Sequence, residues 1–125
     1  MDTASVAMAQ NAADRAATHA DRAAEAARHG WARLAALEAG LAGDCAEDAE
    51  TALTVVLSIG EHTGVVAASI AVRDAWVSTA RAAYIAMDAW HEAHALATER
   101  FRASRDVVSE LHDTGLPRDP PPTSQ

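Results

Sequence analysis

A seven-residue repeat of alanine constrains this fold more than any other feature of the sequence. The heptad Ala13–His19 is followed by Ala20–Ala26, and alanine, aspartate and arginine keep their places in both. Apolar residues recur every three to four positions, which places them in one stripe on a helix and favours pairing with another helix. From Ser5 to about Gly40, the predicted stripe contains Val6, Ala9, Ala13, Ala16, Ala20, Ala23, Ala27, Gly30, Leu34, Leu37 and, just beyond, Leu41.

The composition points the same way. Alanine, the residue with the highest helix propensity, makes up 33 of the 125 residues. It removes little apolar area from water when buried, and only three Trp, one Tyr and one Phe accompany it. We therefore expect an all-α protein, a small bundle of three to four helices with alanine-rich seams. Such a chain needs a second copy or another partner to bury enough surface.

Three main helices are predicted, at about residues 5–40, 45–60 and 65–112. Gly30 falls within the first of them and weakens it by about 1 kcal/mol relative to alanine. Because glycine has no side chain, we interpret Gly30 as a point of close backbone approach, with Trp31 packed beside it.

The boundary between the first two helices is predicted from two glycines and an acidic pair. Gly40 and Gly43 are each suited to the left-handed conformation that ends many helices. Asp44 and Glu47 have the spacing of an N-terminal capping box, which predicts that the second helix begins there.

The segment Gly60–Gly64 has two interpretations. Two glycines within five residues favour a tight turn between antiparallel helices. Alternatively, Gly60, Gly64 and Ala68 form a stripe of small residues in an uninterrupted helix that crosses a neighbour closely. The turn is the favoured interpretation.

The long segment Val65–Leu111 is interpreted as a central helix, buried in its first half and amphipathic in its second. Its length allows a kink or break between Ala97 and Ser104. Two apolar stripes predict two neighbouring helices. One stripe consists of Val72, Trp76, Ala83, Ala86, Trp90, Ala93 and Ala97, and the other of Val77, Ala80, Tyr84, Met87 and Phe101.

The C-terminal end has clear stop signals. Gly115 can take a left-handed cap and Pro117 cannot continue a helix. We therefore expect a single helical-bundle domain over residues 1–115 and a disordered, proline-rich tail over residues 116–125.

Charge and cysteine content limit the partners and the compartment. The net charge of −8 argues against nucleic-acid and anionic-membrane partners. The most apolar window, Ala52–Val72, is interrupted by Glu61 and His62, so no membrane span is expected. A single cysteine, Cys45, excludes an internal disulfide and favours a reducing, cytoplasmic location. Arginine as the only basic residue beside Ala-rich sequence is typical of a GC-rich genome such as those of actinobacteria.

A polar face on the long helix is the candidate for metal chemistry. Asp88, His91 and Glu92 are spaced to share one helical face, and His94 lies close by. A carboxylate three residues before a histidine is a unit that helical bundles use to bind metal ions. No second unit of this kind occurs, so a solvated polar face is the favoured interpretation. No catalytic residue and no cofactor is predicted.

The aromatic residues Trp31, Trp76, Tyr84 and Trp90 allow two interpretations. They either line a ligand pocket or fill the gaps that alanine leaves in a core. Core packing is favoured because aromatic residues at helical spacing in an alanine-rich bundle more often serve that purpose.

The string from Tyr84 to Asp88 resembles a Tyr-x-x-x-Asp string of small proteins exported by the type VII route of actinobacteria. In those proteins the string follows a helical hairpin whose turn is Trp-x-Gly. Here the predicted turns, Gly40–Asp44 and Gly60–Gly64, contain no tryptophan, and Tyr84 lies within a helix. No family is assigned on this basis.

The sequence favours a non-enzymatic interaction or adaptor protein that acts through self-association, with a homodimer expected, or through a protein partner. One alternative is a bundle that binds a metal or small molecule through Asp88, His91 and Glu92. Another is a structural component of a phage or secretion assembly. The predicted interface residues are Ala13, Ala16, Ala20, Ala23, Ala27, Gly30, Trp31, Trp76, Trp90 and Phe101.

Overall fold

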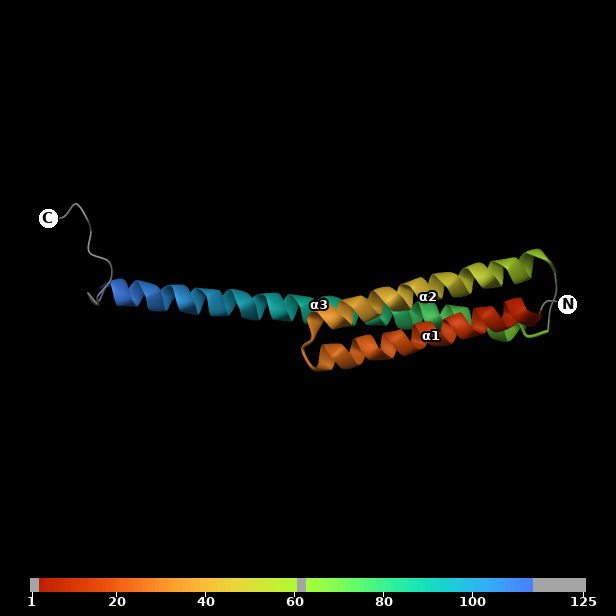
Figure 1. The fold of residues 1–125 in the computed structure, drawn as a ribbon, viewed down its shortest axis with the longest axis horizontal. Helices are drawn as coiled ribbons and strands as arrows, with labels where there is room; N and C mark the ends of the chain where they lie inside the picture. The colour runs from red at the N-terminus through yellow and green to blue at the C-terminus, as the bar shows by residue number, and fades with distance from the viewer. Residues whose placement is uncertain (1–2, 61–62, 114–125) are drawn as a thin grey trace. The chain divides into compact units, whose positions relative to one another are not determined.

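The all-α prediction is confirmed by a computed structural model, which describes residues 3–60 and 63–113. These residues form three helices, α1 (Thr3–Arg28), α2 (Ala32–Ser58) and α3 (Val65–Asp113), and no strand occurs among them (Figure 1). The tail predicted for residues 116–125 lies outside the described residues.

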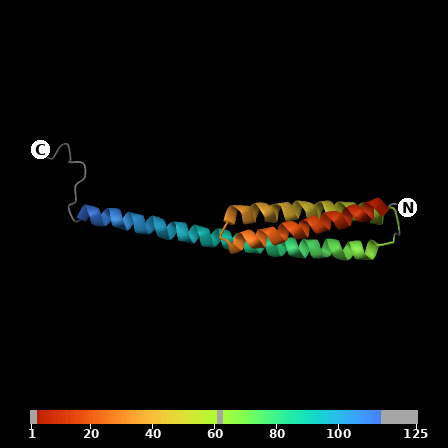
Figure 2. The ribbon, with the colours of Figure 1, turned by 60° about the horizontal axis from the view of Figure 1, so that its bottom comes forward.

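The internal contacts of the chain divide it into two units, Met1–Ala93 and His94–Gln125. In the first unit, α1, α2 and the first part of α3 run side by side in alternating directions (Figures 1 and 2). The second unit contributes the last part of α3, and α3 is helical without interruption to Asp113, so the break allowed after Ala97 does not occur. The single domain expected over residues 1–115 stays a prediction.

The first helix ends at Arg28, so the prediction of one helix over residues 5–40 is wrong. Gly30 takes the left-handed conformation, with φ of +76°. The amide of Gly30 donates to the carbonyl of Ala27 at 3.0 Å, and the amide of Trp31 donates to the carbonyl of Ala26 at 2.9 Å. These two bonds make up a Schellman motif, which satisfies carbonyls that the helix end leaves open. Gly30 is therefore a helix terminator.

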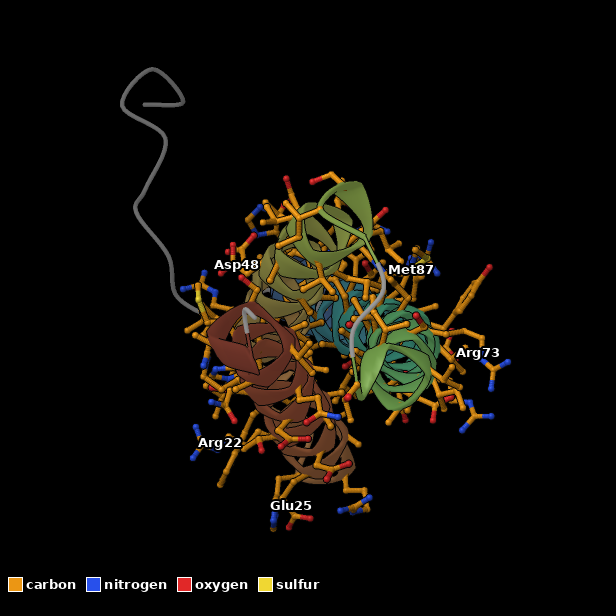
Figure 3. All side chains as sticks on the ribbon, turned by 90° about the vertical axis from the view of Figure 1, so that its right-hand side faces the viewer. Arg22, Glu25, Asp48, Arg73 and Met87 are labelled. Carbon is orange, nitrogen blue, oxygen red and sulfur yellow. The ribbon has the colours of Figure 1, made fainter. Side chains whose placement is uncertain are left out.

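Side chains on either side of the same turn also contact one another. The rings of His29 and Trp31 stack with centroids 4.5 Å apart. His29 Nε2 lies 3.0 Å from Glu25 Oε1, and the guanidinium of Arg28 donates to the same carboxylate. The hydrogen bond from Arg28, and then that from His29, lowers the pKa of Glu25 below its ordinary value. Figure 3 shows Glu25 on the outside of the helices, with the other labelled side chains Arg22, Asp48, Arg73 and Met87.

Helix α2 passes through the boundary that Gly40, Gly43 and Asp44 predicted, and that prediction is also wrong. The reason is a heptad of small residues that continues through both glycines. Residues 32, 35, 39, 42, 46 and 49 are all buried alanines, and Val56 follows in the same register. This register differs from the one continued from α1, which expected Leu34 and Leu37 to be buried, whereas both are exposed.

The separation predicted between the second and third helices is confirmed, because α2 ends at Ser58 and α3 begins at Val65, while Glu61 and His62 of the predicted turn lie outside the described residues. Gly64 has φ of +88°, and a Cβ there would stand 3.3 Å from Cγ1 of Val6 in α1. Both the backbone conformation and the close approach of α1 favour glycine at this position.

Alanine forms nearly the whole interior of the bundle. Of the twenty buried apolar residues described, seventeen are alanine and three are valine (Val6, Val56 and Val72). They form two clusters, and each cluster takes residues from α1, α2 and α3. Val56 is the largest fully buried side chain in the described chain. Small residues at every contact bring the helix axes close together.

The expectation that the aromatic residues fill the core is wrong. Trp76 is 36% exposed, Trp90 51%, Trp31 55% and Tyr84 70%. Helices that touch through alanine leave no space for an indole ring between them. The stripe of α3 that is buried contains Ala68, Val72, Ala75, Thr79, Ala82 and Ala86, and it shares only Val72 and Ala86 with the predicted ones.

Few polar contacts join the helices of the first unit. His19 Nδ1 of α1 lies 2.8 Å from Glu38 Oε2 of α2, and both side chains are mostly buried. This pair links α1 to α2 within the bundle. Thr79 is the buried polar residue of the described core, and its Oγ1 makes no hydrogen bond there.

Candidate interaction surface

The candidate metal ligands all lie on α3 and all are exposed. Asp88, His91 and Glu92 belong to the first unit, and His94 begins the second. Asp88 and Glu92 line a groove of about 280 Å³ beside Arg28 of α1. Across residues 3–60 and 63–113, no three His, Cys, Asp or Glu side chains gather as a metal ion requires. Metal binding at this face stays a prediction without structural support.

The predicted interface residues separate into two groups. Ala13, Ala16, Ala20 and Ala23 are buried against the other helices of the same chain, and Ala27 packs against them. These alanines therefore pack within the bundle of the chain itself, and an interface with a second molecule at these positions stays a prediction. The exposed members are Gly30, Trp31, Trp76, Trp90 and Phe101.

Helix α3 carries a second heptad stripe within the first unit, which sequence reasoning divided between two other stripes. We call it the exposed seam. All its members except the half-buried Ser69 are exposed. Its residues alternate in steps of three and four, as in a coiled-coil stripe. They are Val66, Ser69, Arg73, Trp76, Ala80, Ala83, Met87 and Trp90.

An apolar groove of about 390 Å³ lies beside the exposed seam, between α2 and α3. Its lining from α2 is small, with Ala36, Ala39 and Gly40, and α3 contributes Met87 and Trp90 among others. Further along the same side, Trp76 Nε1 donates to Glu50 Oε2 of α2 at 3.0 Å. A helix placed on the exposed seam would therefore also touch α2.

Acidic residues accumulate on α2. Asp44, Glu47, Asp48 and Glu50 lie within two turns of α2, and all four are exposed. Glu47 is three residues before Glu50, so both lie on the side of α2 that faces Trp76. The stretch of α2 beside Trp76 is therefore negatively charged.

The second unit repeats the heptad spacing in its own part of α3. His94, Ala97, Phe101, Ser104 and Val108 are all exposed, and we call them the C-terminal stripe. Arginines lie beside Phe101, at positions 100, 102 and 105. None of these arginines forms an ion pair with another described residue.

Comparisons with known proteins do not identify the chain: no protein-family profile, curated protein or solved structure matches it. The turn between α1 and α2 does contain a tryptophan, Trp31, contrary to the turns expected from sequence. In this turn glycine comes before tryptophan, as Gly30-Trp31, whereas the turn of the type VII proteins is Trp-x-Gly. In the described part of the chain, none of the helices is both long and apolar enough to cross a membrane.

Proposed function

We propose that this chain is a non-enzymatic interaction protein, which works by presenting the exposed apolar surface of α3 and its neighbours to a protein partner. One observation carries the proposal. Among the described residues, twenty large apolar side chains are exposed, whereas three, all valines, are buried. The protein thus places its smallest apolar residues inside and its largest ones outside.

A surface of this kind is unusual for a monomer. Single exposed apolar residues are common, but large contiguous apolar patches mark interaction sites. Trp, Tyr and Met, which are enriched at interface centres, are exposed on the part of α3 in the first unit, and Phe101, of another enriched type, is exposed in the second unit. A cytoplasmic location remains a prediction from the single cysteine.

In-cell photo-crosslinking tests the proposal. A photo-reactive phenylalanine analogue replaces Tyr84, which is 70% exposed beside the exposed seam. The matched control carries the analogue at Asp21, on the exposed polar side of α1. We expect a discrete protein adduct from position 84, identified by mass spectrometry, and little from position 21. Equal, diffuse labelling from both positions would show that the proposal is wrong.

A further inference from the structure

We propose that a second copy of this chain covers the exposed seam. In this dimer the C-terminal stripe of one copy lies antiparallel along the exposed seam of the other, and the exchange is reciprocal. The inference rests on the proposed function and adds the identity of the partner and the register of the contact.

The second unit gives the first reason for a partner. Its described part is one helix, His94 to Asp113, whose apolar side chains Leu96, Phe101, Val107 and Val108 are all exposed. Helices in proteins gain most of their stability from packing an apolar face, and the apolar side chains of this segment are exposed. A heptad stripe on such a helix is suited to pack against another heptad stripe.

The two stripes complement each other in size when they run antiparallel. With Met87 of one copy opposite Trp90 of the other, Trp76 falls opposite Phe101. The same register puts Ala80 opposite Ala97. Large side chains therefore meet large ones at two levels, and alanines meet between them, which is the alternation that fills an interface without gaps.

The polar members of the stripes favour the same direction. In the antiparallel register Arg73 lies opposite Ser104, and His94 lies opposite Ala83. In a parallel dimer Arg73 would face Arg73 of the second copy. Two like charges in an apolar stripe are costly, so the antiparallel direction is preferred.

Charge complementarity adds to this preference. When Phe101 of one copy lies on Trp76 of the other, its neighbour Arg100 is on the flank of the stripe that faces α2 of that copy and approaches the acidic stretch of α2 beside Trp76. Glu50, which accepts the hydrogen bond from Trp76, and Glu47 lie there. Arg100 thus meets carboxylates of the second copy, at a place where a rim ion pair sets orientation and register.

The groove between α2 and α3 fits the centre of the dimer. Trp90 and Met87 line it, and its other walls are the small residues Ala36, Ala39 and Gly40. An indole from the second copy can enter this space, because small side chains leave room that the chain itself does not fill. A buried aromatic residue near the centre is typical of an interface hot spot.

The first experiment measures the oligomeric state of the full chain by light scattering coupled to size-exclusion chromatography. We expect twice the chain mass for the unmodified protein. Phe101→Glu places a carboxylate in the C-terminal stripe and weakens dimerisation by roughly thirtyfold or more. Leu96→Glu is the matched control, since Leu96 is exposed in the same unit but off the stripe, and it leaves the dimer intact. Circular dichroism verifies that both variants remain helical.

The second experiment reads the register by disulfide exchange in a Cys45→Ser background. Ala80→Cys and Ala97→Cys are prepared as separate chains, mixed and equilibrated in a glutathione buffer. The antiparallel register yields the mixed 80–97 disulfide. A parallel dimer yields 80–80 and 97–97 products, which would overturn the register.

The outcomes separate this proposal from the proposed function. A compact monomer at all concentrations, together with a crosslinked adduct of a different protein at position 84, refutes the dimer and leaves the interaction role standing. A monomer without any site-specific adduct refutes both. Dimers that survive Phe101→Glu refute the C-terminal stripe as the contact.

Discussion

Two stripes on helix α3 have the same heptad spacing, but one stripe is buried and the other is exposed. The buried stripe, which includes Ala68, Ala75 and Ala82, forms part of the bundle interior. The exposed seam, which includes Trp76, Met87 and Trp90, faces outward. Hydrophobicity alone would rank the second stripe as the core, since its side chains offer far more apolar area.

The difference shows that fit between helices decides which stripe is buried. Three helices that meet through alanine on every side reach a close spacing that a single indole would prevent. The large side chains of the exposed seam are then left on the surface of the bundle. The comparison makes four predictions, in order of decreasing effect.

The strongest challenge to the comparison is a large side chain in the buried stripe. Ala68→Leu overpacks a fully buried position and should lower the free energy of unfolding by about 3 kcal/mol. Its neighbour Ala67 is exposed, so Ala67→Leu should change stability by less than about 0.5 kcal/mol. Chemical denaturation followed by circular dichroism measures both. Equal effects would mean that the alanine seam is not tightly packed.

Two glycines of similar sequence context should respond in opposite directions. Gly30→Ala forces a side chain into the left-handed conformation and costs about 1 to 2 kcal/mol. Gly43→Ala, inside α2, meets Thr79 Cγ2 at an ordinary 3.7 Å and should gain up to about 1 kcal/mol from helix propensity. Thermal melts compare the two variants. A loss at Gly43 equal to that at Gly30 would contradict the assignment of the helix boundary.

Thr79 is the polar member of the buried stripe. Removing its hydroxyl tests whether that group destabilises the bundle. Its hydroxyl is buried without a hydrogen-bond partner among the described residues, which is unfavourable. Thr79→Val keeps the shape and should raise the free energy of unfolding by about 1 kcal/mol. Thr79→Ser, which keeps the hydroxyl, serves as the control and should not stabilise. No gain in the valine variant would indicate that the hydroxyl is satisfied in solution.

The smallest effect belongs to an exposed contact outside both stripes. The lowered pKa of Glu25 means that its ionised form stabilises the turn after α1, chiefly through Arg28. Glu25→Gln should therefore reduce stability slightly at neutral pH. The difference from the unmodified protein should disappear as the pH falls below the ordinary value of 4.5 and through the lowered pKa. Melting curves between neutral and acidic pH check this, and a difference that persists in acid contradicts it.

Much of the fold could be predicted from local patterns. The heptad of α1 from Val6 to Ala23 is buried throughout, and the turn between Gly60 and Gly64 separates two helices. The boundary at Gly30 was missed because Gly30, Gly40 and Gly43 are equivalent as helix terminators when each is judged by its neighbours. The alanine heptad from Ala32 to Ala49 is the signal that distinguishes them, since it continues through the latter two.

The candidate surface was less accessible to sequence reasoning. The sequence predicts Phe101, Trp76 and Trp90 as interface residues, and it predicts the alanines of α1 together with them. Both sets have the periodicity of a packing stripe. Periodicity alone does not show whether the helix that packs against the stripe belongs to the same molecule or to another one. Only the positions of α2 and α3 against α1 separate the two sets.

The sequence by itself determined that this chain is helical, that its helices carry heptad stripes and that alanine dominates the first of them. Propensity and spacing are local properties, so they can be read without knowledge of neighbours. The tertiary structure decided which glycine ends α1 and which stripe of α3 is buried. The physical reason is the close packing of the three helices, whose interior holds side chains of alanine and valine size and leaves the indole rings outside.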